Sequence, residues 1–178
     1  MNKIFILCLF LAIPMACSTV KVSSDFDRSE DFSAYKTYAF TQEAEQLPVS
    51  DINRKRVLLA VTNELTKEGF TSTEQQPDVW IDLKVLTQQK ESATATTSSP
   101  YGAGYGYHWG GGFSTTTIDV DQYVEGTLFV DMIDVSKKQL VWQGRAVGVL
   151  DPDASAEKRE EKINAVIKQI FTKYPPQK

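Results

Sequence analysis

Two alternating runs in the C-terminal half of the chain decide the fold. The first reads Val124-Glu125-Gly126-Thr127-Leu128-Phe129-Val130-Asp131-Met132, and the second reads Leu140-Val141-Trp142-Gln143-Gly144-Arg145-Ala146-Val147-Gly148. Apolar or small residues recur at every second position, as they do in strands that bury one face. The connecting residues Ser136-Lys137-Lys138-Gln139 are typical of a turn. We therefore predict a long antiparallel hairpin.

Three shorter runs upstream share the same period. They predict strands at residues 20–23, 37–40 and 79–85. In the third run, Val79, Ile81, Leu83 and Val85 are expected to face the core, whereas Trp80, Asp82 and Lys84 are expected to face outward.

Two segments have helical spacing instead. A helix is predicted from about Asp51 to Glu68, with Ser50 or Asp51 at its start and Gly69 at its end. A second helix begins near Asp153 or Ser155 and ends before Pro175-Pro176. The order is then β-β-α-β-loop-β-β-α. It predicts an α+β fold, a two-layer sandwich with a mostly antiparallel sheet and two helices packed on one face.

Residues 88–117 interrupt the strand pattern. Ser/Thr-rich sequence leads into a stretch of glycines and aromatic residues, and we expect a mobile Gly/aromatic loop over 92–115. Tyr and Trp side chains make adaptable contact surfaces. The candidate contact residues for a ligand or partner, such as an envelope glycan or protein, are Tyr101, Tyr105, Tyr107, His108, Trp109 and Phe113. The alternative is a functionally silent insertion whose rings fold back on the sheet.

The N-terminus reads as an export signal. Lys3 precedes an apolar run that is short for a membrane span, and Ala16 precedes Cys17, so residues 1–16 are a predicted signal peptide. The junction resembles a bacterial lipobox, which implies acylation of Cys17 with diacylglycerol and palmitate chains. An ordinary cleaved signal with a chance cysteine is the alternative. Ser18 and Thr19, with no Asp at position 19, imply the outer membrane, with the protein lipid-anchored on its periplasmic side.

The composition indicates that the chain after the predicted signal peptide, residues 17–178, is one globular domain. Hydrophobic residues make up 42% of the chain and charged residues 24%, which is typical of a folded protein. The formal net charge of −4 argues against nucleic acid as a partner. The expected attachment to the membrane is therefore the lipid on Cys17 alone.

Several motifs, taken in order, resemble one known family. They are Asp25-Phe26-Asp27, the run Asp31–Phe40, the runs Gly126–Asp134 and Leu140–Ala146, and the closing Tyr174-Pro175-Pro176. The chain is similar along nearly its whole mature length to the bacterial lipoproteins of the domain-of-unknown-function 4136 family. That resemblance implies an envelope location and an α+β fold, and it implies no reaction, ligand or catalytic residue.

The candidates for chemistry are few. His108 is the only histidine and lies in a Gly-rich segment, so it predicts neither a catalytic triad nor a zinc site. The glycines at 102–106 are not followed by a helix, as a phosphate cradle requires. We expect a non-enzymatic binding or scaffold module with no cofactor and no metal.

Two other functions stay open. Acid/base hydrolysis of envelope polymers would use Asp119, Asp121, Asp131 and Asp134, although a solvated sheet face also explains these residues. A small-molecule carrier would need a closed apolar pocket.

Overall fold

The predicted hairpin lies inside a six-stranded sheet. The computed structural model describes residues 20–98 and 115–177, and its strands are ordered β1-β6-β5-β4-β2-β3. The strands span Lys21–Phe26 (β1), Thr37–Phe40 (β2), Thr71–Ser72 (β3), Val79–Ser98 (β4), Thr115–Asp134 (β5) and Gln139–Leu150 (β6). β5 and β6 pair antiparallel, as predicted, whereas β2 runs parallel to both β3 and β4. The α+β class is confirmed, and the sheet is mixed.

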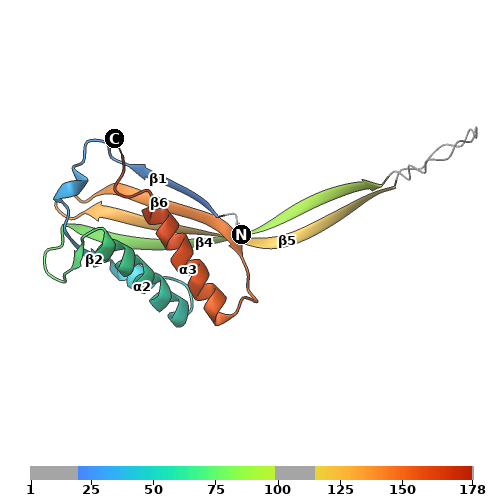
Figure 1. Cartoon of the computed structure of the whole chain (residues 1–178), viewed down its shortest axis with the longest axis horizontal. Coiled ribbons are helices and arrows are strands. Elements are labelled where there is room, and N and C mark those ends of the chain that lie inside the picture. Colours follow the sequence, from blue (N-terminus) through green and yellow to red (C-terminus); the bar gives the residue numbers. More distant parts are fainter. Residues whose placement is uncertain (1–19, 99–114, 178) are drawn as a thin grey trace, which may run out of the picture.

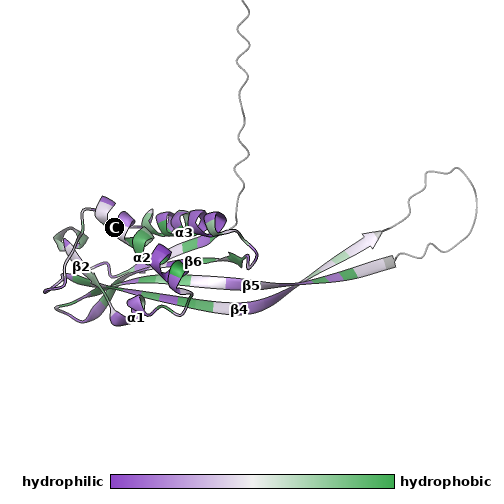
Figure 2. Cartoon of the chain, turned by 90° about the horizontal axis from the view of Figure 1, so that it is seen from below, coloured by the Kyte–Doolittle hydropathy of each residue, from purple (hydrophilic) through white to green (hydrophobic). Residues whose placement is uncertain are grey.

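Two long helices lie side by side over one face of the sheet (Figures 1 and 2). They are α2 (Asp51–Lys67) and α3 (Ala156–Phe171), and a short helix, α1 (Gln42–Glu45), and a 3-10 turn (Phe32–Ala34) complete the set. The hydroxyls of Ser50 and Ser155 accept the first-turn N–H groups of α2 and α3, the capping that the sequence predicted. The sequence did not predict α1 or β3, because so few residues carry no readable period.

Gly69 ends α2 in the left-handed region, with φ of +87°. The following residue, Phe70, donates its N–H to the carbonyl of Leu65 at 2.9 Å and is buried in the core. The chain thereby turns back beneath the helix toward the sheet.

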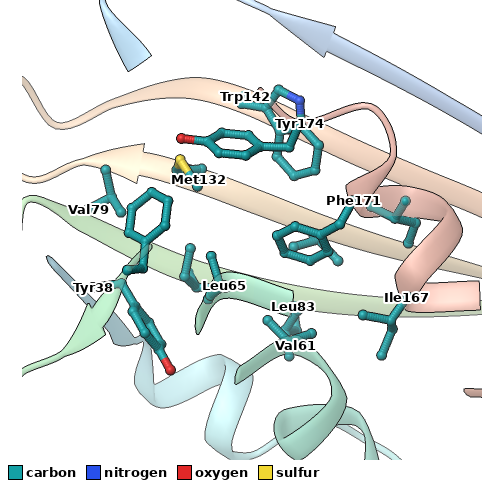
Figure 3. Packing of buried hydrophobic residues seen from close by; sticks show 14 of the residues in the cluster. Tyr38, Val61, Leu65, Val79, Leu83, Met132, Trp142, Ile167, Phe171 and Tyr174 are labelled. Carbon is teal, nitrogen blue, oxygen red and sulfur yellow. The ribbon is translucent and has the colours of Figure 1, made fainter. Parts of the chain in front are cut away.

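The core fills the space between the sheet and the helices (Figure 3). Trp142 of β6 is fully buried, and its ring centroid lies 5.9 Å from that of Phe171 and 5.4 Å from that of Tyr174. Gly144 makes this packing possible, because a Cβ there would overlap Ile170 and lie 2.6 Å from a ring carbon of Trp142.

β4 and β5 are longer than the sequence predicted. The loop expected over 92–115 is wrong at both ends: residues 92–98 continue β4 and residues 115–117 belong to β5, and the two strands pair in one register to Ser98 opposite Thr115. The threonines at 94, 96 and 97 are β-branched, and two of them alternate with Ala93 and Ala95, so the sequence suits a paired strand. Residues 99–114 lie outside the described residues.

We predict that Gly144→Ala destabilises the fold by about 1–3 kcal/mol, because the new methyl group forces apart two buried side chains. Urea unfolding followed by tryptophan fluorescence should show a lower midpoint at an unchanged slope. Gly148→Ala is the matched control, since the nearest atom to its Cβ is Val20 Cγ2, 3.3 Å away at the start of the described chain. Equal shifts for the two variants would contradict this packing.

Candidate functional site

The most unusual feature of the structure is a two-stranded arm. β6 last pairs with β5 where Leu150 lies opposite Val124, and β2 last pairs with β4 at Ile81. Beyond Val124, residues 90–98 of β4 and 115–123 of β5 pair only with each other, and we call them the arm. At about 3.3 Å per residue the arm is about 30 Å long. It projects from one end of the sheet (Figures 1 and 2).

The arm has two chemically different sides, because side chains alternate along each strand. One side carries the apolar residues of the arm: Ala93 lies opposite Val120, and Ala95 lies opposite Ile118. The same side also carries the hydrogen-bonded pair Glu91 and Gln122 near the arm root and Thr97 opposite Thr116 near its tip. Ile118 is 64% exposed and Val120 is 56% exposed. The other side is polar and carries Ser92, Thr94, Thr96, Thr117, Asp119 and Asp121.

The residues predicted from sequence as contact or lipidation sites lie outside the described residues. These are Cys17 and the candidate contact residues Tyr101, Tyr105, Tyr107, His108, Trp109 and Phe113. The structure does place their flanks: the segment 99–114 leaves the arm after Ser98 and re-enters it at Thr115, and these two residues are paired. The chain before Val20 enters at the start of β1.

The carboxylates considered for hydrolysis are spread along β5. Asp119 and Asp121 are exposed on the polar side of the arm, whereas Asp131 and Asp134 are buried in the body. Ten residues of extended strand separate Asp121 from Asp131, a distance of about 33 Å. The two groups are therefore not arranged as a pair across one cleft.

Asp82 and Asp131 form the main charged cluster on the sheet face that the helices leave open. They lie opposite each other on β4 and β5 and are 7% and 4% exposed. Lys84 Nζ lies 2.8 Å from Asp82 Oδ2 and 2.9 Å from Asp131 Oδ2. The hydroxyl of Thr41 donates to Asp82 at 2.8 Å, and the Gln143 amide donates to Asp131 at 2.7 Å.

This cluster corrects the expectation that Asp131 belongs to a solvated sheet face. Asp82 and Asp131 point away from the helices, as predicted, but neighbouring side chains on the same face bury them. Asp134, which was also expected to be solvated, is 4% exposed. Burial alone would raise the pKa of Asp82, yet the hydrogen bonds from Lys84 and Thr41 outweigh it and hold that pKa below its usual value. Hydrogen bonds to Asp82 and Asp131 raise the pKa of Lys84. The sequence signal that identifies this cluster is the outward Asp82/Lys84 pair combined with the hairpin register.

A second charged cluster fixes the end of the sheet far from the arm. The Tyr35 hydroxyl lies 2.8 Å from Asp134 Oδ2 and 3.0 Å from Glu30 Oε2, and Lys137 Nζ lies 2.6 Å from Glu30. Burial opposes ionisation of Asp134, but hydrogen bonds from Lys137 N–H, Ser136 and Tyr35 lower its pKa. Because these contacts tie the β5–β6 turn to the residues after β1, the cluster has a structural explanation.

The described ranges offer little concave surface. A groove of about 250 Å³ lies between α2 and α3, and another of about 220 Å³ lies beside β1 and β6. Among residues 20–98 and 115–177, no group of acidic, His or Cys side chains could hold a metal ion. No helix in that part of the chain is long and apolar enough to span a membrane.

We predict that Lys84→Met destabilises the protein by about 1–3 kcal/mol at neutral pH, because it leaves two buried carboxylates without their shared cation. Solvent screening favours the lower part of this range, since the Lys84 side chain is 57% exposed. Thermal or urea unfolding measures the change. Lys90→Met should have a much smaller effect, because it leaves only one carboxylate without its cation and Glu125 is 23% exposed, against 10% and 6% for the side chains of Asp82 and Asp131.

The destabilisation caused by Lys84→Met should depend on pH. A carboxyl whose pKa is lowered by folding contributes stability above its unfolded pKa of about 3.9, and that contribution is lost as the pH falls through the folded value. The penalty of Lys84→Met should therefore be largest near neutrality and shrink below about pH 4. A penalty that is constant with pH would contradict the role of the carboxylates.

Comparison with known proteins agrees with this fold. A PDZ domain protein from Parabacteroides distasonis is similar in structure, with a TM-score of 0.55 and 17% identity over 89% of this chain. The match spans only 37% of that protein. Two PelC dodecamer structures from Paraburkholderia phytofirmans have TM-scores of 0.51 and 0.50, each with 10% identity. They cover 89% and 86% of this chain and 99% and 95% of PelC, respectively.

No curated protein matches the sequence. The sequence model of one family, described as "Domain of unknown function (DUF4136)", matches residues 22–176. This match spans every described helix and nearly all of each strand, and it confirms the family that the sequence motifs resembled. The chain therefore belongs to the DUF4136 family.

Proposed function

We propose that this protein is a non-enzymatic, lipid-anchored envelope protein that acts as a binding or scaffold module. Acylated Cys17 attaches it to the outer membrane on the periplasmic side, and its contact element is the arm together with segment 99–114. The sheet and its two long helices form a two-layer sandwich that serves as a rigid platform for this element.

The arm is the observation that carries the proposal. A two-stranded ribbon is marginally stable in water by itself, and here both of its outer edges are unpaired among the described residues. A partner that covers the ribbon or pairs with its edges stabilises it. Because segment 99–114 begins and ends at the paired residues Ser98 and Thr115, its tyrosines and tryptophan are attached about 30 Å from the body.

Two further observations support this assignment. The main charged clusters, around Asp82 and around Asp134, are saturated by hydrogen bonds within the chain, as expected of structural groups. PelC, a protein of similar fold, forms a dodecamer, so this architecture is compatible with a scaffold. The partner of this chain is an envelope glycan or protein.

Lipidation is tested by mass spectrometry of the protein purified from its native membrane. We predict a mature N-terminus at Cys17 carrying diacylglycerol and an amide-linked fatty acid, and loss of membrane attachment in Cys17→Ser. A cleaved chain with an unmodified thiol at Cys17 would contradict the anchor.

The contact element is tested with two shortened chains. One replaces 99–114 with Asn-Gly between Ser98 and Thr115, and the other replaces 90–123 with the same turn between Gln89 and Val124. We predict that both lose co-sedimentation with purified peptidoglycan, or lose binding to the purified protein partner that a photo-crosslinker at Tyr105 captures in the full chain. A crosslinker at exposed Lys55 on α2 is the control. Unchanged partner binding by both shortened chains would contradict this role.

A further inference from the structure

The predicted anchor and the arm leave the body at the same end. β1 begins at Lys21 opposite Val147, and Val20 lies against Gly148, two residues before the end of β6. The arm starts where β6 ends, at Leu150 opposite Val124. Starting at Lys21, β1 runs away from the arm toward the far end of the sheet (Figure 1).

The distance from the anchor to the body is short. Only Ser18 and Thr19 lie between Cys17 and Val20, so an extended chain of three residue steps reaches about 10 Å. The twelve residues of β6 extend about 40 Å in the opposite direction from the arm. If the arm pointed away from the membrane, the body would have to lie between the bilayer and Val20, and the tether is too short for that arrangement.

The arm is equally unsuited to crossing the bilayer. Its two outer edges carry unpaired backbone N–H and C=O groups, which are costly to bury in hydrocarbon. Asp119 and Asp121 on its polar side add charge. The remaining orientation lays the arm along the membrane surface.

One side of the arm suits that position. The side chains of Ile118 and Val120 lie on the same side of the ribbon as Val124 and Leu150, and Leu150 packs against Gly126 on this side. This side is continuous with the position of Val20 at Gly148, where the tether begins. Ile118, Val120 and Leu150 are three of the nine large hydrophobic residues exposed in the described chain. Leu86 and Val149, which are also exposed near the arm root, lie opposite Thr127 and Glu125 and so belong to the other face.

We infer that the apolar side of the arm is a second membrane contact, which lies on the bilayer surface beside the anchor. This inference rests on the proposed acylation of Cys17. Anionic lipid does not attract the arm, because its described residues carry Glu91, Asp119 and Asp121 against Lys90 alone. On the contact side Glu91 accepts a hydrogen bond from Gln122 at 3.0 Å, so the membrane contact is made by the apolar side chains of Ile118, Val120 and Leu150. It should therefore persist in high salt and on zwitterionic phosphatidylcholine vesicles.

The test uses the acylated mature chain in vesicles of phosphatidylethanolamine and phosphatidylglycerol. Cys8 leaves with the signal peptide and Cys17 is blocked, so Ile118→Cys provides a single free thiol for an environment-sensitive dye. Thr117→Cys is the matched control, since it is also exposed but points to the polar side. Val120→Cys and Asp119→Cys form a second pair if the first one perturbs the arm, as judged by circular dichroism.

We expect the dye at position 118 to emit at shorter wavelength on membrane binding and to be quenched by nitroxide-labelled lipid. The dye at position 117 should show little of either change. Equal access of aqueous iodide to both dyes, on chains that float with the vesicles, would overturn the inference while the anchor stands. The dye at position 118 could instead be shielded from iodide without being quenched by nitroxide-labelled lipid, and lose this shielding when the protein is diluted among more vesicles. That result would overturn the inference and assign this side to a second copy of the chain. Failure of the chain to float would instead overturn the anchor, and with it this inference.

Discussion

The structure depends on the unequal pairing of β5. Its inner half, from Val124 to Asp134, lies between β4 and β6 and beneath two helices, whereas its outer half pairs with β4 alone. The inner half therefore supports the core, and the outer half extends that ladder into solvent. The arm begins where β6 ends, and the described chain begins nearby, with Val20 beside Gly148.

The two halves also differ in how they hold charge. Inside the sheet, Asp82 and Asp131 are buried and share one lysine, an arrangement that is costly to break. On the arm, Asp119 and Asp121 are exposed and mark the polar side. The same residue type is thus buried and paired in the body and exposed on one side of the arm.

Much of the fold follows from the sequence because its signals are long. The β5–β6 hairpin, α2 with its Ser50 cap, and the end of α2 at Gly69 were all predictable from period and capping. The extent of β4 was not, because serine, threonine and alanine between 92 and 98 resemble linker composition and become strand only through pairing with β5. Burial of Asp131 was missed for a related reason: alternation gives the face of a strand but not what else covers that face. Cys17 and the aromatic segment lie outside the described residues.

The proposed roles of the arm require β4 and β5 to remain paired there, in the register that places Ala93 opposite Val120. Nuclear magnetic resonance of the isotopically labelled mature chain tests this most directly. We expect cross-strand contacts between the backbone protons of Ala93 and Val120 and of Ala95 and Ile118, with strand-like chemical shifts along both segments. Random-coil shifts beyond Gln89 and Val124, with no such contacts in membrane-bound protein, would contradict it.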